Sequence, residues 1–229
     1  GNLIILVNDN QMSIAENHGG FYRNLAELRA TNGQAENNFF KTFGLDYKYL
    51  ENGNDIESLI HLFEEVKDID HPIVLHIHTE KGRGYQPALE NKEAFHWHMP
   101  FDLETGQSKV IDSGKSYSSV MLDYMDKKVS EGLPLVAINA AIPGIFGLKQ
   151  FAAKYPDRYI DAGIAEQFTI TFGGAMAAAG ARPIIFHNST FVQRAYDQFW
   201  HDLAINEEPA IVIVKGGVIS GSDETHQGS

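Results

Sequence analysis

Short apolar runs that alternate with stretches of helical spacing constrain the fold of this chain more than any other feature. The runs lie at residues 3–9, 72–79, 133–139, 158–163, 182–188 and 209–215. Runs of this length, bounded by turn-forming residues, are typical of strands covered on both faces. Helical spacing is found at residues 21–30, 55–69, 117–129, 146–156, 166–180 and 191–205. Because strands and helices alternate with short connections, we predict an α/β fold with parallel, doubly wound sheets.

A change in composition divides the chain into two similar α/β halves. Residues 99–115 lack periodicity and are rich in polar and turn-forming residues, which is typical of a connection between domains. We place the linker at residues 106–116, between units at residues 1–105 and 117–229. The chain opens directly on a predicted strand and closes on a polar stretch, so we expect it to be an internal piece of a longer protein.

The composition limits the partners and the chemistry. The 229 residues include no cysteine and carry a formal net charge of -12, so disulfides and thiolate metal sites are excluded. Acidic charge without a basic run argues against binding to nucleic acid or to an anionic membrane. No apolar run approaches the roughly 20 residues needed to cross a bilayer. We expect a soluble, cytoplasmic protein.

Four polar motifs follow predicted strands, at the positions where open α/β sheets bind ligands. They are NDNQM at residues 8–12, KGRGY at 81–85, IAEQ at 164–167 and GSDETHQG at 221–228. Each motif alone has an ordinary structural explanation, such as a helix cap or a glycine-rich turn. Their order on two α/β units is more specific than any one of them.

Glu166 raises a separate question, because it opens a stretch that otherwise has the small, apolar residues of a buried helix. A buried carboxylate without a partner is unfavourable, and no partner lies beside it in the sequence. The residues alone leave two interpretations open. Glu166 is either a carboxylate favoured by the positive end of the helix dipole or a group that binds a ligand.

Together the motifs resemble the thiamine diphosphate enzymes of the transketolase superfamily, and within it the family of 1-deoxy-D-xylulose-5-phosphate synthases. Five segments carry the resemblance, at residues 6–17, 81–88, 151–167, 189–198 and 225–229. The resemblance covers nearly the whole chain and implies two units of the thiamine diphosphate-binding fold. The first would be the C-terminal part of the pyrophosphate-binding domain, and therefore incomplete. The second would be the pyrimidine-binding domain, truncated at its C-terminus.

The resemblance also implies which residues hold the cofactor. Glu166 matches the glutamate that hydrogen-bonds N1' of the aminopyrimidine and so promotes loss of the C2 proton, with thiamine diphosphate as the electron sink. Asn10 and the carbonyl of Met12 match the Mg²⁺ ligands, and Mg²⁺ prefers such hard oxygen donors. Tyr85 matches a residue that contacts the cofactor, and Phe191 matches the aromatic that stacks on the aminopyrimidine. We expect these residues near one cleft between the two units.

On the substrate side, His96 and His226 match histidines that act on the substrate, and Arg194 matches an arginine that binds its phosphate. Arginine suits bidentate recognition of phosphate. Lys215 stands where the family has a further substrate arginine. The implied reaction decarboxylates pyruvate and joins the two-carbon unit to D-glyceraldehyde 3-phosphate. The product, 1-deoxy-D-xylulose 5-phosphate, serves isoprenoid, thiamine and pyridoxal biosynthesis, and the enzymes are usually homodimers.

The sequence departs from the family pattern in ways that keep other functions open. The family's GDG segment, which supplies an acidic Mg²⁺ ligand, would precede Gly1, so we expect these 229 residues alone to bind the cofactor poorly and to be inactive. Phe168, Asn188 and Lys215 replace the usual His, Tyr and Arg. A transketolase-like enzyme with another acceptor is one alternative, and a non-catalytic structural homologue is a second. A Rossmann-type nucleotide-binding domain is a third, but no GxGxxG motif follows a strand.

Overall fold

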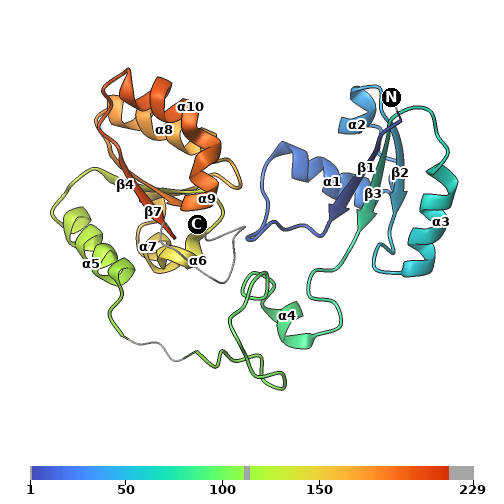
Figure 1. Ribbon diagram of the computed structural model, residues 1–229, viewed down its shortest axis with the longest axis horizontal. Helices are drawn as coiled ribbons and strands as arrows, with labels where there is room; N and C mark the ends of the chain where they lie inside the picture. Colours follow the sequence, from blue (N-terminus) through green and yellow to red (C-terminus); the bar gives the residue numbers. More distant parts are fainter. Residues whose placement is uncertain (1, 111–113, 217–229) are drawn as a thin grey trace. The chain divides into compact units, whose positions relative to one another are not determined.

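The computed structural model describes residues 2–110 and 114–216. The chain divides into two compact units, Gly1–Ile111 and Asp112–Ser229, which we call unit 1 and unit 2. Unit 1 is built on a three-stranded sheet and unit 2 on a separate four-stranded sheet (Figure 1). Both sheets are parallel and carry helices, which confirms the predicted α/β fold with two sheet-based units.

The three parallel strands of unit 1 have their carboxyl ends at the same edge of the sheet. The strands are β1 (Ile4–Asp9), β2 (Asp46–Leu50) and β3 (Ile73–His78), in the order β1-β3-β2. Asp9 pairs with His78, and Leu50 pairs with the adjacent residue of β3. The residues that follow these three strands are therefore neighbours, although they lie far apart in the sequence.

Helices cover both faces of the unit 1 sheet (Figure 1). They are α1 (Gly20–Ala30), α2 (Phe39–Thr42) and α3 (Ile56–Val66), followed after the sheet by α4 (Gln86–Glu90). On one face, Leu62 and Val66 of α3 pack against β3. On the other face, Leu28 of α1 and Phe40 of α2 pack against Val74. Asp55 caps α3 as its spacing predicts, because its carboxylate accepts a hydrogen bond from the Ser58 N–H at 2.8 Å.

Three elements of unit 1 are absent from the sequence-based prediction. Among the described strands, β2 pairs with β3 alone, and its side chains are partly exposed, so its sequence DYKYL lacks the apolar run of a strand covered on both faces. Helices α2 and α4 have four and five residues. Both are too short for a helical period to show in the sequence.

Unit 2 is a parallel sheet with the strand order β5-β4-β6-β7. Its strands are β4 (Leu135–Asn139), β5 (Tyr159–Asp161), β6 (Arg182–Asn188) and β7 (Ile211–Lys215). Its first helices are α5 (Tyr117–Ser130), α6 (Pro143–Phe146), α7 (Leu148–Lys154) and the 3-10 turn Pro156–Arg158. Helix α8 (Glu166–Ala178) follows β5, and Ile170 of α8 packs against Ile138 and Ile185 of the sheet. On the opposite face, the ring of Phe146 contacts that of Phe186, with centroids 5.2 Å apart.

Two helices that the sequence predicts as continuous are broken. The prediction of one helix over 146–156 is wrong, because Gly147 adopts a left-handed φ of 72° between α6 and α7. The prediction of one helix over 191–205 is also wrong. That region forms α9 (Ser189–Val192), the 3-10 turn Gln193–Ala195, α10 (Tyr196–Gln198) and the π-helical segment Phe199–Ala204.

The π-helical segment packs closely against α8. A Cβ added to Gly174 of α8 would lie 2.7 Å from the backbone oxygen of Asp202. Thr171 of the same helix donates a hydrogen bond to the Asp202 carboxylate. The segment that contacts α8 is therefore π-helical, where the sequence predicts a regular α-helix. Among the residues that the structure describes, no helix combines the length and the apolar character that crossing a membrane requires.

Candidate functional site

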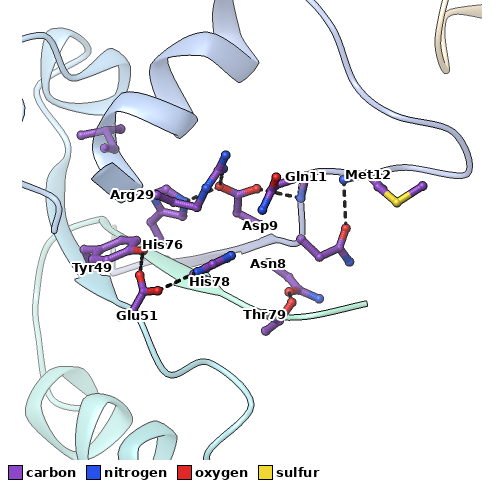
Figure 2. A network of polar contacts seen from close by, with 12 residues as sticks. Asn8, Asp9, Gln11, Met12, Arg29, Tyr49, Glu51, His76, His78 and Thr79 are labelled. Carbon is purple, nitrogen blue, oxygen red and sulfur yellow. Dashed lines mark hydrogen bonds and ion pairs between the residues drawn. The ribbon is translucent and has the colours of Figure 1, made fainter. Parts of the chain in front are cut away.

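The carboxyl edge of the unit 1 sheet carries a buried cluster centred on Asp9, the last residue of β1. The Asp9 side chain is 4% exposed. Its Oδ2 accepts hydrogen bonds from Arg29 of α1 and from Nε2 of His76 of β3, the latter at 2.9 Å. Figure 2 shows these two side chains converging on Asp9. Three elements thus meet at one carboxylate.

The partners of Asp9 determine its charge and the tautomer of His76. Burial alone would raise the pKa of Asp9, but hydrogen bonds from His76, Arg29 and the Gln11 N–H outweigh it and lower the pKa to about 2. The Tyr47 hydroxyl lies 2.7 Å from Nδ1 of His76. Because Nε2–H donates to Asp9, Nδ1 accepts from the tyrosine. The Asp9 carboxylate is therefore an anion that accepts from three donors, and His76 links it to Tyr47. Burial and the Asp9 charge raise the pKa of Tyr47, which keeps its hydroxyl neutral.

The turn that follows Asp9 contains the two predicted metal ligands. Gln11 has a left-handed φ of 68°, and its N–H donates to Asp9 Oδ1 at 3.1 Å. The Met12 N–H donates to Asn10 Oδ1, also at 3.1 Å. Met12 pairs with Glu16 in an isolated antiparallel bridge whose hydrogen bonds are made by the flanking residues. The Met12 carbonyl therefore points away from the bridge.

Asn10 and Met12 together offer an amide oxygen and a backbone carbonyl, the donor types that Mg²⁺ accepts. A cavity of about 500 Å³ lies beside them and is also lined by Arg29 and Asp9. Within residues 2–110 and 114–216, no group of three or more His, Cys, Asp or Glu side chains is arranged to hold a metal ion. The donor chemistry of the turn fits Mg²⁺, and a further anionic ligand would have to come from elsewhere or from a bound diphosphate.

Lys81 joins this turn to two other loops. Its ammonium donates to the Ser13 carbonyl at 2.6 Å and lies 3.2 Å from Nδ1 of His96. Burial lowers the pKa of Lys81, partly opposed by the charge of Glu93. The structure thereby brings the predicted substrate histidine, His96, next to the loop of the predicted metal ligands. Sequence reasoning missed Lys81, although it opens the KGRGY motif.

Tyr85, the other end of that motif, lies in an aromatic cluster. Its ring contacts those of Phe95 and Phe101, at centroid distances of 5.5 and 5.9 Å. Its hydroxyl donates to the Leu103 carbonyl at 3.0 Å. Gly82 has a φ of 86°, and a Cβ there would lie 2.8 Å from the backbone of Ala88. One glycine of the motif therefore has a packing role against α4.

A second polar cluster lies on the β2 side of the same edge (Figure 2). Glu51 accepts hydrogen bonds from the Tyr49 hydroxyl and from Nδ1 of His78, the latter at 3.0 Å. These two bonds lower the pKa of Glu51. Thr79 donates to Asn8 across the sheet edge. The carboxyl edge of unit 1 is thus polar along its whole width.

In unit 2, the structure gives Glu166 a partner. Glu166 is the first residue of α8 and is 3% exposed. Its Oε2 accepts a hydrogen bond from Nη1 of Arg194 at 2.7 Å, and the arginine side chain is 49% exposed. Two predicted site residues that are 28 positions apart are therefore brought together. The ion pair offsets the burial of the carboxylate.

Two buried side chains, Thr169 and His187, lie beside the first turn of α8. The Thr169 hydroxyl donates to the Glu166 carbonyl at 2.7 Å and lies 2.9 Å from Nε2 of His187. Because the hydroxyl hydrogen is used, His187 donates from Nε2–H. Its Nδ1 then has no hydrogen-bond partner in the described part of the chain. Burial lowers the pKa of His187 to about 4.

The loop before α8 is shaped by Asp161, the last residue of β5. Asp161 Oδ1 accepts hydrogen bonds from the N–H groups of Ala141 and Gly163, at 2.9 and 3.0 Å. Asp161 Oδ2 accepts from the Asn139 side chain at 3.2 Å. Since Asn139 ends β4, this carboxylate ties two strand ends to the IAEQ motif. Its hydrogen bonds therefore shape the loop that leads to α8.

Three predicted site residues of unit 2 remain, namely Phe191, Lys215 and His226. Phe191 lies partly buried on α9. Lys215 ends β7, where its ammonium donates to the Ile145 carbonyl at 2.7 Å and lies 5.9 Å from the centroid of the Phe146 ring. His226 lies outside the described residues. Asn10 and Tyr85 belong to unit 1, and Glu166 and Phe191 to unit 2, so their meeting at one cleft stays a prediction.

Sequence reasoning missed Arg29, His76, Thr169 and His187. Two of them had a signal, because His76 and His187 interrupt strands that are otherwise apolar. A histidine inside a buried strand needs a polar partner. The identity of that partner was not visible in the sequence.

Comparisons with known proteins show which family the chain is similar to. Residues 113–229 match the family described as transketolase, pyrimidine binding domain. Residues 31–79 match the family described as 1-deoxy-D-xylulose-5-phosphate synthase. The chain is 35% identical over 265 residues to 1-deoxy-D-xylulose-5-phosphate synthase 1 of Geobacter sulfurreducens, covering 99% of this chain and 42% of that protein. It is 37% identical over 235 residues to the synthase of Listeria monocytogenes, covering 99% of this chain and 39% of that protein.

The synthase of Clostridium perfringens is 35% identical over 263 residues, which cover 99% of this chain and 42% of that protein. The chain thus matches these relatives along almost all of its own length. It spans about two fifths of theirs, with 42% of the Geobacter protein covered.

Proposed function

The chain belongs to the transketolase family, and from that premise we propose that it carries the cofactor site of a thiamine diphosphate-dependent transferase. The reaction would decarboxylate pyruvate and join the two-carbon unit to D-glyceraldehyde 3-phosphate. The product would be 1-deoxy-D-xylulose 5-phosphate, a precursor for isoprenoid, thiamine and pyridoxal biosynthesis. Relatives named for that product, which match 99% of this chain, support the proposal. Enzymes of this family depend on thiamine diphosphate and Mg²⁺.

The observation that carries the proposal is the environment of Glu166. Its carboxylate is buried at the start of α8, and Arg194 pairs with only one of its oxygens. Oε1 accepts no hydrogen bond from any described residue. A buried acid with one oxygen held and one available suits a ligand that offers a proton.

Bound thiamine diphosphate would supply the electron sink for decarboxylation. Glu166 would accept a hydrogen bond from the aminopyrimidine at N1' and hold the proton there. Arg194 orients that carboxylate through its bond to Oε2. Phe191 and Tyr85 would contact the cofactor rings. Asn10 Oδ1 and the Met12 carbonyl would hold Mg²⁺.

On the substrate side, His96, His226, Arg194 and Lys215 would contact pyruvate or the phosphosugar. The position of His96 next to Lys81 and the Ser13 carbonyl supports a place beside the metal-binding turn. We assign residues 1–105 to the C-terminal part of the pyrophosphate-binding domain and 117–229 to the pyrimidine-binding domain, truncated at its C-terminus, with the linker at 106–116. A cytoplasmic homodimer is the assembly that the family resemblance favours.

A second candidate is a transferase with a different acceptor aldehyde. Lys215 favours it, because its ammonium donates one of its hydrogens to the Ile145 carbonyl and so has fewer donors left for a phosphate. Lysine is also a point charge that cannot replace a bidentate arginine. The choice between the two candidates depends on the acceptor and leaves the cofactor chemistry unchanged.

The test is Glu166→Gln in the full-length protein, assayed with pyruvate and D-glyceraldehyde 3-phosphate. Glutamine keeps the shape but loses the charge, so we expect turnover to fall roughly 10²- to 10⁴-fold, with an unchanged melting temperature. Glu131→Gln is the matched control, since Glu131 is an exposed, ion-paired carboxylate at the end of α5. Equal turnover in the Glu166 variant and the native protein would refute the assignment. Product from other aldehydes but not from the phosphosugar would favour the second candidate.

A further inference from the structure

The turn that presents Asn10 and Met12 has an unfavourable backbone and needs support. Gln11, between them, adopts a left-handed φ of 68°. Residues other than glycine enter this region at a cost, and they stay there only when their surroundings hold them. Two hydrogen bonds in which a backbone N–H donates to a side-chain oxygen span the turn, from Gln11 N–H to Asp9 and from Met12 N–H to Asn10. The first of these depends on where the Asp9 carboxylate is held.

Asp9 is held from outside the turn. Its Oδ1 is used by Gln11, and its Oδ2 is shared by Arg29 and His76. His76 is in turn fixed by the Tyr47 hydroxyl at 2.7 Å. Both His76 and Asp9 are buried, so neither can turn toward water for a replacement bond. The carboxylate therefore has one orientation in which all of its described partners are satisfied.

We propose that Arg29 is a positioning residue that acts through Asp9 to hold the turn at residues 10–12 in the conformation that presents its two metal ligands. The proposal rests on the proposed function for the identity of the metal as Mg²⁺. Arg29 does not itself touch the metal in this scheme. It reaches the turn from α1, and its side chain is largely buried against Asp9.

Arg29 is the member of the cluster whose role can be separated from packing. His76 and Tyr47 lie in the sheet, where any substitution changes the core. Arg29 lies in the last turn of α1, outside the apolar cluster that this helix forms with Val74. Without the guanidinium, the buried carboxylate retains His76 as its one side-chain donor. The hydrogen bond that the Gln11 N–H donates to Asp9 then has an acceptor that is held less firmly.

The test compares Arg29→Met with the native full-length protein, using two readouts. The first is amide hydrogen exchange of peptides covering residues 9–17, measured by mass spectrometry without metal or cofactor. We expect exchange in the variant to be roughly five- to tenfold faster, the effect of losing one intramolecular hydrogen bond. The second is Mn²⁺ binding in the presence of thiamine diphosphate, followed by electron paramagnetic resonance. We expect affinity to fall roughly 10- to 100-fold, as for other residues that orient metal ligands.

Three further variants make the result specific. Arg29→Lys keeps the charge and should recover part of both losses. Lys67→Met is the control for loss of a positive charge, because Lys67 is exposed at the end of α3 and forms no ion pair with a described residue. It should change neither readout by more than about twofold. Leu62→Ala destabilises unit 1 from the opposite face of the sheet and should leave Mn²⁺ affinity unchanged.

The other outcomes test either the role of Arg29 or the proposed function. Unchanged exchange at residues 9–17 in Arg29→Met would overturn the proposal, and so would an equal loss of Mn²⁺ affinity in Leu62→Ala. If Arg29→Met does not fold, Arg29→Lys is judged by the same readouts. If the native protein binds no Mn²⁺ with thiamine diphosphate, the proposed function fails. The exchange rates then decide alone whether Arg29 holds the turn.

Discussion

Lowering the pH should destabilise unit 2 through a single buried histidine, His187. The side chain is 0% exposed, and burial lowers its pKa from the ordinary 6.5 to about 4. Well above pH 6.5 the imidazole is neutral in both the folded and the unfolded state, so the full stability is present. Between pH 6.5 and about 4, the unfolded chain binds a proton that the folded chain does not, and stability falls. Below about pH 4 both states are protonated, and no further loss arises from this residue.

The size of the effect follows from the two pKa values. The difference between 6.5 and about 4 corresponds to roughly 3 kcal/mol of unfolding free energy. That amount is a large part of the roughly 5–15 kcal/mol that stabilises a typical protein. The loss should be complete near pH 4 and absent above about pH 7.

The matched experiment uses these 229 residues, whose two tryptophans are Trp97 and Trp200. It compares His187→Leu with His187 in a Trp97→Phe background, so that Trp200 is the fluorescent reporter for unit 2. Urea unfolding is measured at pH 7.5 and pH 4. At pH 7.5 we expect similar stability, because the variant loses a bond to Thr169 but also removes a buried nitrogen without a described partner. Between the two pH values, the protein with His187 should lose about 3 kcal/mol more than the leucine variant. The control is His201→Leu, at an exposed histidine of the same unit. Between the two pH values it should lose as much stability as the protein that keeps His187 and His201.

A direct measurement accompanies the stability data. The ¹⁵N shifts of the imidazole should show the Nε2–H tautomer at neutral pH, because the Thr169 hydroxyl donates to the Glu166 carbonyl. The reasoning would be refuted by an excess loss below about 1 kcal/mol or by a His187 that titrates above pH 6.

Two other predictions concern packing and hydrogen bonding. Gly174→Ala should destabilise unit 2 by roughly 1–3 kcal/mol, because the added Cβ would lie 2.7 Å from the Asp202 carbonyl. Gly144→Ala, where nothing lies within 4 Å, should be neutral in the same urea titration, and equal effects would contradict this account. Tyr47→Phe should destabilise unit 1 by roughly 1–3 kcal/mol, because it removes the hydrogen bond to His76 and leaves a buried nitrogen unpaired. Tyr22→Phe is the control, and a Tyr47 variant as stable as the native chain would argue against the cluster.

The sequence predicted the parts of the fold that depend on neighbouring residues. Apolar runs located β1, β3, β4, β6 and β7 to within a few residues. The helical spacing from Asp55 located α3 and its cap. These signals are reliable because side-chain period and capping act over one or two turns of the chain. The sequence also pointed to Asn10, Met12 and Glu166 as groups placed after strands, since in parallel sheets such positions gather at one edge.

Only the tertiary structure decided which groups meet. Asp9 finds Arg29 and His76, which are 20 and 67 positions away, and Glu166 finds Arg194, 28 positions away. Packing also broke the predicted helix at residues 191–205 and recruited β2 as an edge strand. Such contacts have no signature in local sequence, because a buried charge selects its partner by distance in space. Local sequence predicted which polar groups follow the strands, and the packing of helices on sheets determined which side chains each of them contacts.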